Sequence, residues 1–238
     1  MQFWLCPLVA FLLGSIPFGL IIARAKGIDL REHGSGNIGA TNVLRVVGKK
    51  HGIACLLLDA LKGFIPVVIA INLIQIEGKR TGFFHIGGLD HWALVLPAAR
   101  QFDGQLVHVL TALAAVLGHN YSPWVGFKGG KGIATSAGVY LALMPVGLLL
   151  LVVVWLLAFF TTRYVSVASI VAAAALPLIT IYGSWHHGLI ANGTWNKPLF
   201  VFSVVIGVLA IWKHRSNIQR LRDGTEHRFT RKPKSGNV

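Results

Sequence analysis

The sequence predicts an all-α, polytopic integral membrane protein with about seven transmembrane helices, and three observations lead to this fold class. Hydrophobic residues make up 54% of the 238 residues and charged residues only 13%, whereas soluble domains carry about 25% charged residues. Several apolar runs reach the roughly 20 residues that a helix needs to cross a bilayer. Basic residues gather in alternate connections between the runs. We therefore expect a single transmembrane domain over 1–238, with a basic tail from about 214.

Seven apolar segments are the candidate spans. The first, "MQFWLCPLVAFLLGSIPFGLIIA", lacks a basic n-region and a clear cleavage site, so we interpret it as a retained helix. The long run 133–162 is divided at "LMPVG", because Pro145 and Gly147 favour a turn. Cys6 and Cys55 both lie in apolar segments and are too few to indicate a disulfide framework or a metal site. The expected spans are 3–23, 52–76, 105–124, 133–145, 146–162, 165–185 and 198–213.

The distribution of Lys and Arg predicts the orientation. Seventeen of the 22 fall in 24–51, 128–131, 163 and 213–238, while the alternate connections hold few. The positive-inside rule makes the basic side cytoplasmic. The N-terminus is then outside and the C-terminus inside, which an odd number of spans satisfies.

The stretch "HGSGNIGATN", 33–42, has the G-x-G-x-x-G spacing of a dinucleotide-binding loop, with Asp59 twenty residues beyond the last glycine. That motif must follow a buried strand, but here a membrane helix and a charged linker precede it. An ion pair with Lys62 explains Asp59 better. The simplest alternative is that 33–42 forms a flexible turn. The glycines of this stretch, however, are interleaved with short polar side chains, as in loops that cradle phosphate or carboxylate oxygens. These side chains belong to Ser35, Asn37, Thr41 and Asn42.

A second glycine-rich loop, "GHNYSPWVGFKGGKGIATS", is predicted on the same side of the membrane. Lys128 and Lys131 flank Gly129 and Gly130, which places two ammonium groups beside unshielded backbone N–H groups. The alternative is that two lysines at the cytoplasmic end of a helix only follow the positive-inside rule or contact anionic lipid headgroups. The interleaved glycines favour an anion site.

Two further clusters complete the predicted cytoplasmic face. Ser166 and Ser169 lie three residues apart at the start of a span, where they face the same side of a helix. His214 and Asn217 have the same spacing within a basic stretch after the last span. The alternatives are packing serines and a basic tail that binds lipid headgroups.

Four motifs together carry a resemblance to a known family. "GSIPFGLIIARAKGIDLREHGSGNIGATN", "GHNYSPWVGFKGGKGIATSAG", "RYVSVAS" and "HRSNIQRLRDGTE" resemble, in order, the signatures of the bacterial acyl-phosphate-dependent glycerol-3-phosphate acyltransferases, the PlsY family. The resemblance covers the chain from Gly14 to about Arg228. It implies seven transmembrane helices in the bacterial inner membrane and an active site facing the cytoplasm. It also implies transfer of a fatty acyl group from acyl phosphate to glycerol 3-phosphate, giving lysophosphatidate and phosphate for phospholipid biosynthesis.

The resemblance also implies which partners and which site residues to expect. We expect no metal, cofactor or nucleic acid, and the partners are the two substrates and membrane lipid; the sequence does not set the oligomeric state. The loops 77–104 and 183–197 are longer than is usual in the family. The expected catalytic residues are Ser35, Asn37, Lys131 and His214, and the expected substrate-binding residues are Gly34, Gly36, Thr41, Asn42, Arg45, Lys128, Gly129, Gly130, Ser166, Ser169 and Asn217.

Three alternatives are weighed against this interpretation. A small-solute or anion transporter would place its site near the midplane between broken helices, whereas here the polar groups gather at one face. Within the acyltransferase class, an acyl-enzyme on Ser35 competes with direct transfer, but no Ser-His-Asp pattern supports it. His85 and Asp90 match the H-x4-D spacing of unrelated glycerolipid acyltransferases, yet they are predicted on the opposite side of the membrane.

Overall fold

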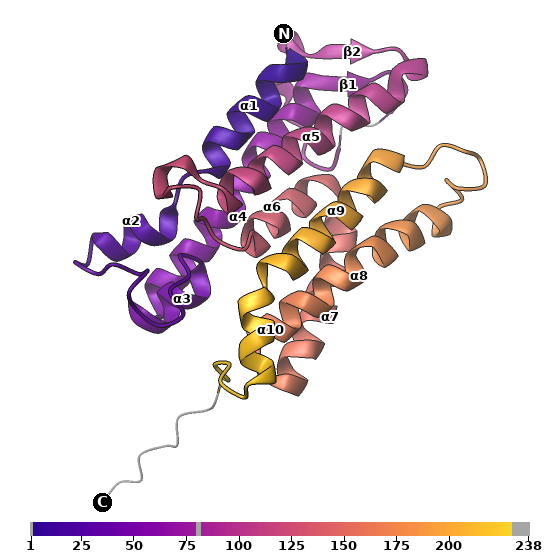
Figure 1. Cartoon of the computed structure of the whole chain (residues 1–238). Helices are drawn as coiled ribbons and strands as arrows, with labels where there is room; N and C mark the ends of the chain where they lie inside the picture. The colour runs from indigo at the N-terminus through magenta and orange to yellow at the C-terminus, as the bar shows by residue number, and fades with distance from the viewer. Residues whose placement is uncertain (1, 80–81, 230–238) are drawn as a thin grey trace, which may run out of the picture.

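A computed structural model describes residues 2–79 and 82–229 of the protein. Within these residues the fold is mostly α-helical, with one small sheet of two strands. Figure 1 shows an elongated bundle with two distinct ends: β1 and β2 lie beside the start of α1 at one end, and α2, α3 and α10 lie at the other. The bounds of these elements follow.

The first predicted span is interrupted rather than continuous. It forms α1 (Gln2–Gly14) and α2 (Phe18–Arg24), separated by a short non-helical segment. Pro17 causes the break, because it has no N–H and disfavours helical geometry at Ile16. Phe3–Arg24 nevertheless remains long and apolar enough to cross a membrane as one 22-residue unit.

The next region holds α3 (Ala40–Val46), the long α4 (Lys49–Leu73) and α5 (Gln101–Asn120). The connection between α4 and α5 contains structure that the sequence analysis did not predict. Strands β1 (Ile74–Ile76) and β2 (Leu94–Leu96) pair in parallel, and the short 3-10 helices η1 (Gly87–Trp92) and η2 (Ala98–Arg100) flank β2.

The predicted division of 133–162 is confirmed, because the helix breaks at Met144, directly before Pro145. Pro145 occupies the first position of the next helix, where its missing N–H costs nothing. The remaining elements are η3 (Pro123–Val125), α6 (Ile133–Leu143), α7 (Pro145–Thr162), α8 (Val165–His186), α9 (Lys197–Lys213) and α10 (Arg215–Arg222).

Four helical segments within the described residues are long and apolar enough to span a membrane, and the bent pair of α9 and α10, at 50°, would be a fifth. Each of the seven predicted apolar segments is mostly helical, but 52–76 ends in β1 and 105–124 extends beyond the end of α5. The 11 residues of α6 rise only about 16 Å, however, against a hydrocarbon core of about 30 Å. The seven-span count therefore stays a prediction.

Small residues bring the helices into close contact, as is common between helices in membranes. A Cβ at Gly138 of α6 would lie 1.9 Å from the carbonyl oxygen of Ala60 on α4, and one at Gly63 of α4 would lie 2.3 Å from that of Thr135. No larger side chain fits at either glycine. These contacts fix α6 against α4 and thereby set the position of the loop that precedes α6.

Candidate functional site

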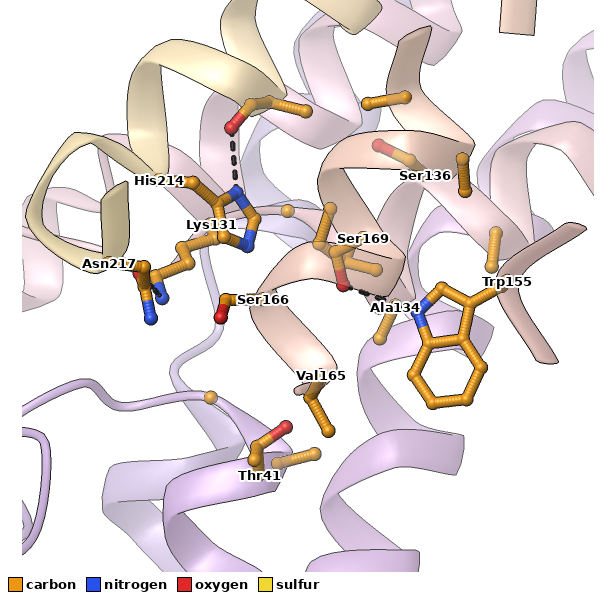
Figure 2. Close-up of a pocket in the computed structure, with 18 of the residues that line it drawn as sticks. Thr41, Lys131, Ala134, Ser136, Trp155, Val165, Ser166, Ser169, His214 and Asn217 are labelled. Carbon is orange, nitrogen blue, oxygen red and sulfur yellow. Dashed lines mark hydrogen bonds between the residues drawn. The ribbon is translucent and has the colours of Figure 1, made fainter. Parts of the chain in front are cut away.

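A cavity of about 420 Å³ lies among residues of α3 to α10, and Figure 2 shows part of its lining. The structure brings together most of the residues that the sequence analysis selected. Those lining the cavity are Ser35, Asn37, Thr41, Asn42, Arg45, Lys131, Ser166, Ser169, His214 and Asn217. Those not among its lining residues are Gly34, Gly36, Lys128, Gly129 and Gly130.

The cavity changes from polar to apolar along its length. On α8 its lining runs from Ser166 to Leu176, a rise of about 15 Å at roughly 1.5 Å per residue. On α9 it continues from Ala210 to Ile206, and on α7 from Trp155 to Leu148. Most of the charged and amide side chains belong to its other end, and Asp59 of α4 also lines the cavity. The site therefore has a polar mouth and an apolar arm that extends along the membrane helices.

Asn42 organises the first glycine-rich loop. Its Oδ1 accepts a 3.0 Å hydrogen bond from the Ser35 N–H, and its Nδ2 donates to the carbonyl oxygens of His33 and Leu30. Gly34 has a φ of 62°, and a Cβ there would lie 2.3 Å from Asn42 Oδ1. Gly34 and Asn42 thus shape the loop that presents Ser35 to the cavity.

A hydrogen-bonded chain joins the second loop to α10 and to the segment after it. Lys131 Nζ donates to Asn217 Oδ1, and Asn217 Nδ2 donates to Glu226 Oε1 at 2.7 Å. Glu226 also accepts from Ser166 Oγ at 2.9 Å and from Arg220 Nε at 2.7 Å. Residues from three parts of the chain are therefore held in one arrangement around the mouth.

The mouth carries an excess of positive charge. Lys131, Arg45 and Arg220 line the cavity together with the carboxylate of Glu226, and a second lining carboxylate, that of Asp59, is paired with Lys62. Burial lowers the pKa of Lys131 to about 8; the charge of Glu226 opposes this shift, and Arg220 and Arg45 add to it. Burial alone would raise the pKa of Glu226, but hydrogen bonds from Asn217, Ser166 and Arg220 lower it overall. An anion entering the mouth relieves the repulsion among the cations.

His214 presents a hydrogen-bond acceptor at the mouth. Its Nδ1 lies 2.7 Å from the carbonyl oxygen of Ala210, and a carbonyl only accepts, so Nδ1 carries the proton and Nε2 has a free lone pair. Burial and the nearby charge of Lys131 lower the pKa of His214 to about 4. The ring is therefore neutral near pH 7 and suits the orientation of a substrate hydroxyl.

Comparison with known proteins identifies the chain. Residues 4–224 match the protein family described as "Glycerol-3-phosphate acyltransferase". The chain belongs to this family. The glycerol-3-phosphate acyltransferase of Geobacter sulfurreducens is 43% identical over 222 residues, which is 93% of this chain and 94% of the relative. That of Aquifex aeolicus is 44% identical over 220 residues, 92% of this chain and 95% of the relative.

Solved structures agree with this assignment. One is the crystal structure of PlsY (YgiH), an integral membrane glycerol 3-phosphate acyltransferase, in its glycerol 3-phosphate form. Its sequence is 40% identical, the match covers 97% of this chain and 96% of the PlsY chain, and the TM-score is 0.77. Its lysophosphatidic acid form is 39% identical, with the same coverages and a TM-score of 0.74. The chain is thus an integral membrane acyltransferase of the PlsY family.

Two residues at the mouth of this acyltransferase were not predicted from the sequence. Glu226 and Arg220 were interpreted as part of a basic tail, because charged residues after a membrane helix are usually solvated or bind lipid headgroups. The structure pairs them at 2.7 Å and turns both into the cavity lining. Both residues lie within the motif "HRSNIQRLRDGTE", so the family resemblance was the signal that could have found them.

The H-x4-D pair lies far from the cavity of the acyltransferase. His85 Nε2 and Asp90 Oδ2 are 3.3 Å apart and about half-exposed, in the connection that holds β2 at the other end of the bundle (Figure 1). Neither residue lines the cavity.

Asp59 and Lys62 form the predicted ion pair, at 2.7 Å.

Proposed function

We propose that this acyltransferase moves a fatty acyl group from acyl phosphate to glycerol 3-phosphate, giving lysophosphatidate and phosphate. The observation that carries the proposal is the combination of a cationic mouth and an apolar arm in one cavity. Acyl phosphate has the matching two parts, an anionic headgroup and an alkyl chain. Glycerol 3-phosphate brings a second phosphate to the same mouth. The solved relative in glycerol 3-phosphate and lysophosphatidic acid forms supports the acceptor and the product.

The cations of the mouth hold two phosphates close together despite their mutual repulsion. Lys131, Arg45 and Arg220 supply fixed or nearly fixed positive charge, and charge-assisted hydrogen bonds to phosphate are among the strongest in proteins. Ser35, Asn37 and Thr41 add short polar side chains from the first glycine-rich loop and α3. The apolar arm on α7, α8 and α9 takes the alkyl chain, because burying it there removes apolar surface from water.

The reaction needs alignment more than a strong base. The glycerol hydroxyl oxygen attacks the carbonyl carbon of the mixed anhydride, the bond from that carbon to the phosphate oxygen breaks, and the hydroxyl proton passes to an oxygen of the departing phosphate. Positioning and stabilisation of the oxyanion by hydrogen-bond donors supply the acceleration. His214 Nε2 accepts a hydrogen bond from the other hydroxyl of the glycerol and thereby orients the acceptor. Among the described residues, no histidine or carboxylate hydrogen-bonds to Ser35 Oγ, which favours direct transfer over an acyl-enzyme.

The same proposal sets the enzyme in the bacterial inner membrane, with seven spans and the cavity mouth facing the cytoplasm. Its support is the gathering of basic connections at the end of the bundle with α2, α3 and α10. Single cysteines at the exposed positions Lys26, Lys128 and Thr225 should react with a membrane-impermeant thiol reagent only from the cytoplasm. A cysteine at Asn192 should react only from outside. Labelling of position 128 from outside would contradict the topology.

Donor choice tests the proposed chemistry. Purified enzyme should form lysophosphatidate from palmitoyl phosphate and glycerol 3-phosphate with no carrier protein present. Lys131→Ala should abolish most of this activity, which ties the product to the cavity. Robust turnover with palmitoyl coenzyme A or palmitoyl acyl carrier protein, and none with palmitoyl phosphate, would refute the donor assignment and leave the family assignment intact.

A further inference from the structure

Three ionisable side chains are buried beside the second glycine-rich loop, and the proposed reaction does not use them, although two of them, Asp59 and His119, also line the cavity. Asp59, Lys62 and His119 are only 2%, 5% and 6% exposed. Lys62 Nζ lies 2.7 Å from Asp59 Oδ1 and also donates at 2.7 Å to the carbonyl oxygen of Ile16, at the break between α1 and α2. His119 Nδ1 lies 3.7 Å from Asp59 Oδ1. The charges of Asp59 and Lys62 compensate each other, and the imidazole packs beside them.

The second glycine-rich loop rests directly on His119. The Gly130 N–H donates to the His119 carbonyl oxygen at 3.2 Å. A Cβ at Gly130 would lie 2.2 Å from His119 Nε2, and a Cβ at Gly129 would lie 2.0 Å from the His119 carbonyl oxygen. The loop therefore has no room to approach further, and any retreat would break the hydrogen bond. Lys131 is the next residue along the chain and extends into the cavity.

We propose that His119 is a positioning residue that fixes Lys131 at the mouth of the cavity, and that Asp59 holds the imidazole in place for this purpose. This inference rests on the proposed function, in which Lys131 holds a substrate phosphate. The two glycines are required because the loop backbone must lie against the ring and carbonyl of His119. This explains why Gly129 and Gly130 are absent from the cavity lining, although they flank a residue that belongs to it.

The geometry favours positioning over a role for His119 as the catalytic base. His119 is among the residues that line the cavity, but both of its nitrogens face protein atoms. Its Nδ1 faces the Asp59 carboxylate, and Gly130 packs against its Nε2.

A double-mutant cycle between His119 and Lys131 tests the coupling. Lys131→Ala should lower kcat/KM about a hundredfold, as for the loss of a transition-state hydrogen-bond donor, and His119→Ala should lower it about tenfold. Since His119 acts through Lys131, the double variant should lose no more than about threefold beyond Lys131→Ala alone, whereas independent sites would multiply to about a thousandfold. Where His119→Ala reduces the yield of folded protein, His119→Gln replaces it in the same cycle.

His108→Ala is the matched control, because His108 lies on the same helix α5 and its Nε2 lies 2.8 Å from the carbonyl oxygen of Ile74, away from the cavity. Its effects and those of Lys131→Ala should multiply. A multiplicative result for His119 and Lys131 as well would overturn the positioning role. Wild-type activity of Lys131→Ala would instead overturn the proposed function on which it rests.

Steric compensation gives an independent test. Gly130→Ala alone should lower kcat/KM about tenfold or more, because the new methyl group collides with the imidazole. In the His119→Ala background the imidazole is gone, so Gly130→Ala should add at most about a twofold loss. Gly129→Ala collides with the backbone carbonyl of residue 119, so His119→Ala should not relieve its effect. If His119→Ala relieved the losses of both glycine variants equally, or of neither, the positioning role of His119 would be contradicted.

Discussion

Ser166 Oγ donates a 2.9 Å hydrogen bond to Glu226 Oε1, and this bond joins the start of α8 to the segment that follows α10. The same carboxylate accepts from Asn217 and Arg220. The region after the last membrane helix is thus part of the site, in addition to any contact that its basic residues make with lipid headgroups.

Replacing Glu226 should release the mouth of the cavity. Glu226→Ala leaves Asn217 Nδ2 and Ser166 Oγ without their acceptor and frees Arg220, so we expect a loss of roughly 2 kcal/mol in transition-state stabilisation, about thirtyfold in kcat/KM. Steady-state kinetics with both substrates measures it. Asp223→Ala is the control, since Asp223 is exposed and its carboxylate accepts from Gln219, and it should stay within about twofold of the parent. Equal effects of the two variants would count against a role for Glu226 in the site.

The pH dependence should report the protonation of Lys131. Its pKa in the free enzyme is lowered to about 8, chiefly by burial, so its charge is present below that pH and is lost as the pH rises through it. Guanidinium groups keep their charge in proteins, and His214, with a pKa of about 4, is already neutral. We therefore expect kcat/KM to fall above about pH 8.

Lys131→Arg provides the control for this profile, because a guanidinium keeps its charge to much higher pH. The kcat/KM of this variant should be lower than that of the parent, since the planar guanidinium differs in shape from the lysine ammonium. It should nevertheless show no fall between pH 8 and pH 9.5. A flat wild-type profile over that interval would show that Lys131 does not control the rate.

The H-x4-D pair should be dispensable. His85→Ala and Asp90→Ala should each keep activity within about threefold of the parent, under ~1 kcal/mol, because both residues lie at the end of the bundle opposite the cavity mouth. Ser35→Ala, assayed beside them, should lose most of its activity. Essential His85 and Asp90 together with a dispensable Ser35 would refute the site.

Tyr140 should limit how long an acyl chain the apolar arm accepts. The deepest lining residues on α6, α8 and α9 are Tyr140, Leu176 and Ile206, and the Tyr140 hydroxyl donates to Ser203 Oγ at 3.1 Å. Tyr140→Ala opens space beyond this point, so the ratio of stearoyl to myristoyl phosphate turnover should rise several-fold. One methylene group in a hydrophobic pocket contributes roughly 1 kcal/mol or more to discrimination between substrates. Tyr140→Phe keeps the ring and should leave the ratio within about twofold. An unchanged ratio in Tyr140→Ala would show that the chain leaves the cavity before reaching this residue.

The sequence was sufficient to predict the helices and much of the cavity lining, because both follow from strong local signals. Long apolar runs must form helices in a bilayer, and Ser35, Lys131, Ser166 and His214 stand out as polar residues beside the ends of such runs. The family resemblance then indicated that these separate clusters belong to one site. The interruption at Pro17 was also accessible from the sequence, but the continuous apolar run on both sides of it favoured a single helix.

Other features depend on contacts between distant segments, which one sequence does not reveal. Gly129 and Gly130 look like a phosphate loop by composition, yet the structure packs them on His119. Glu226 looks like one more charge in a solvated tail, and only the fold brings it to Ser166, 60 residues away in sequence. The parallel pairing of β1 and β2 involves three residues in each strand, too short a pattern for alternation to be visible.

The most direct test of the account is phosphate release from palmitoyl phosphate by the purified enzyme, with and without glycerol 3-phosphate. Direct transfer in the cavity predicts slow release without the acceptor, and fast release with it that matches lysophosphatidate formation mole for mole. Lys131→Ala should lose this acceptor-dependent release. A stoichiometric burst of phosphate without glycerol 3-phosphate would contradict direct transfer and indicate an acyl-enzyme, and no release under either condition would contradict acyl phosphate as the donor.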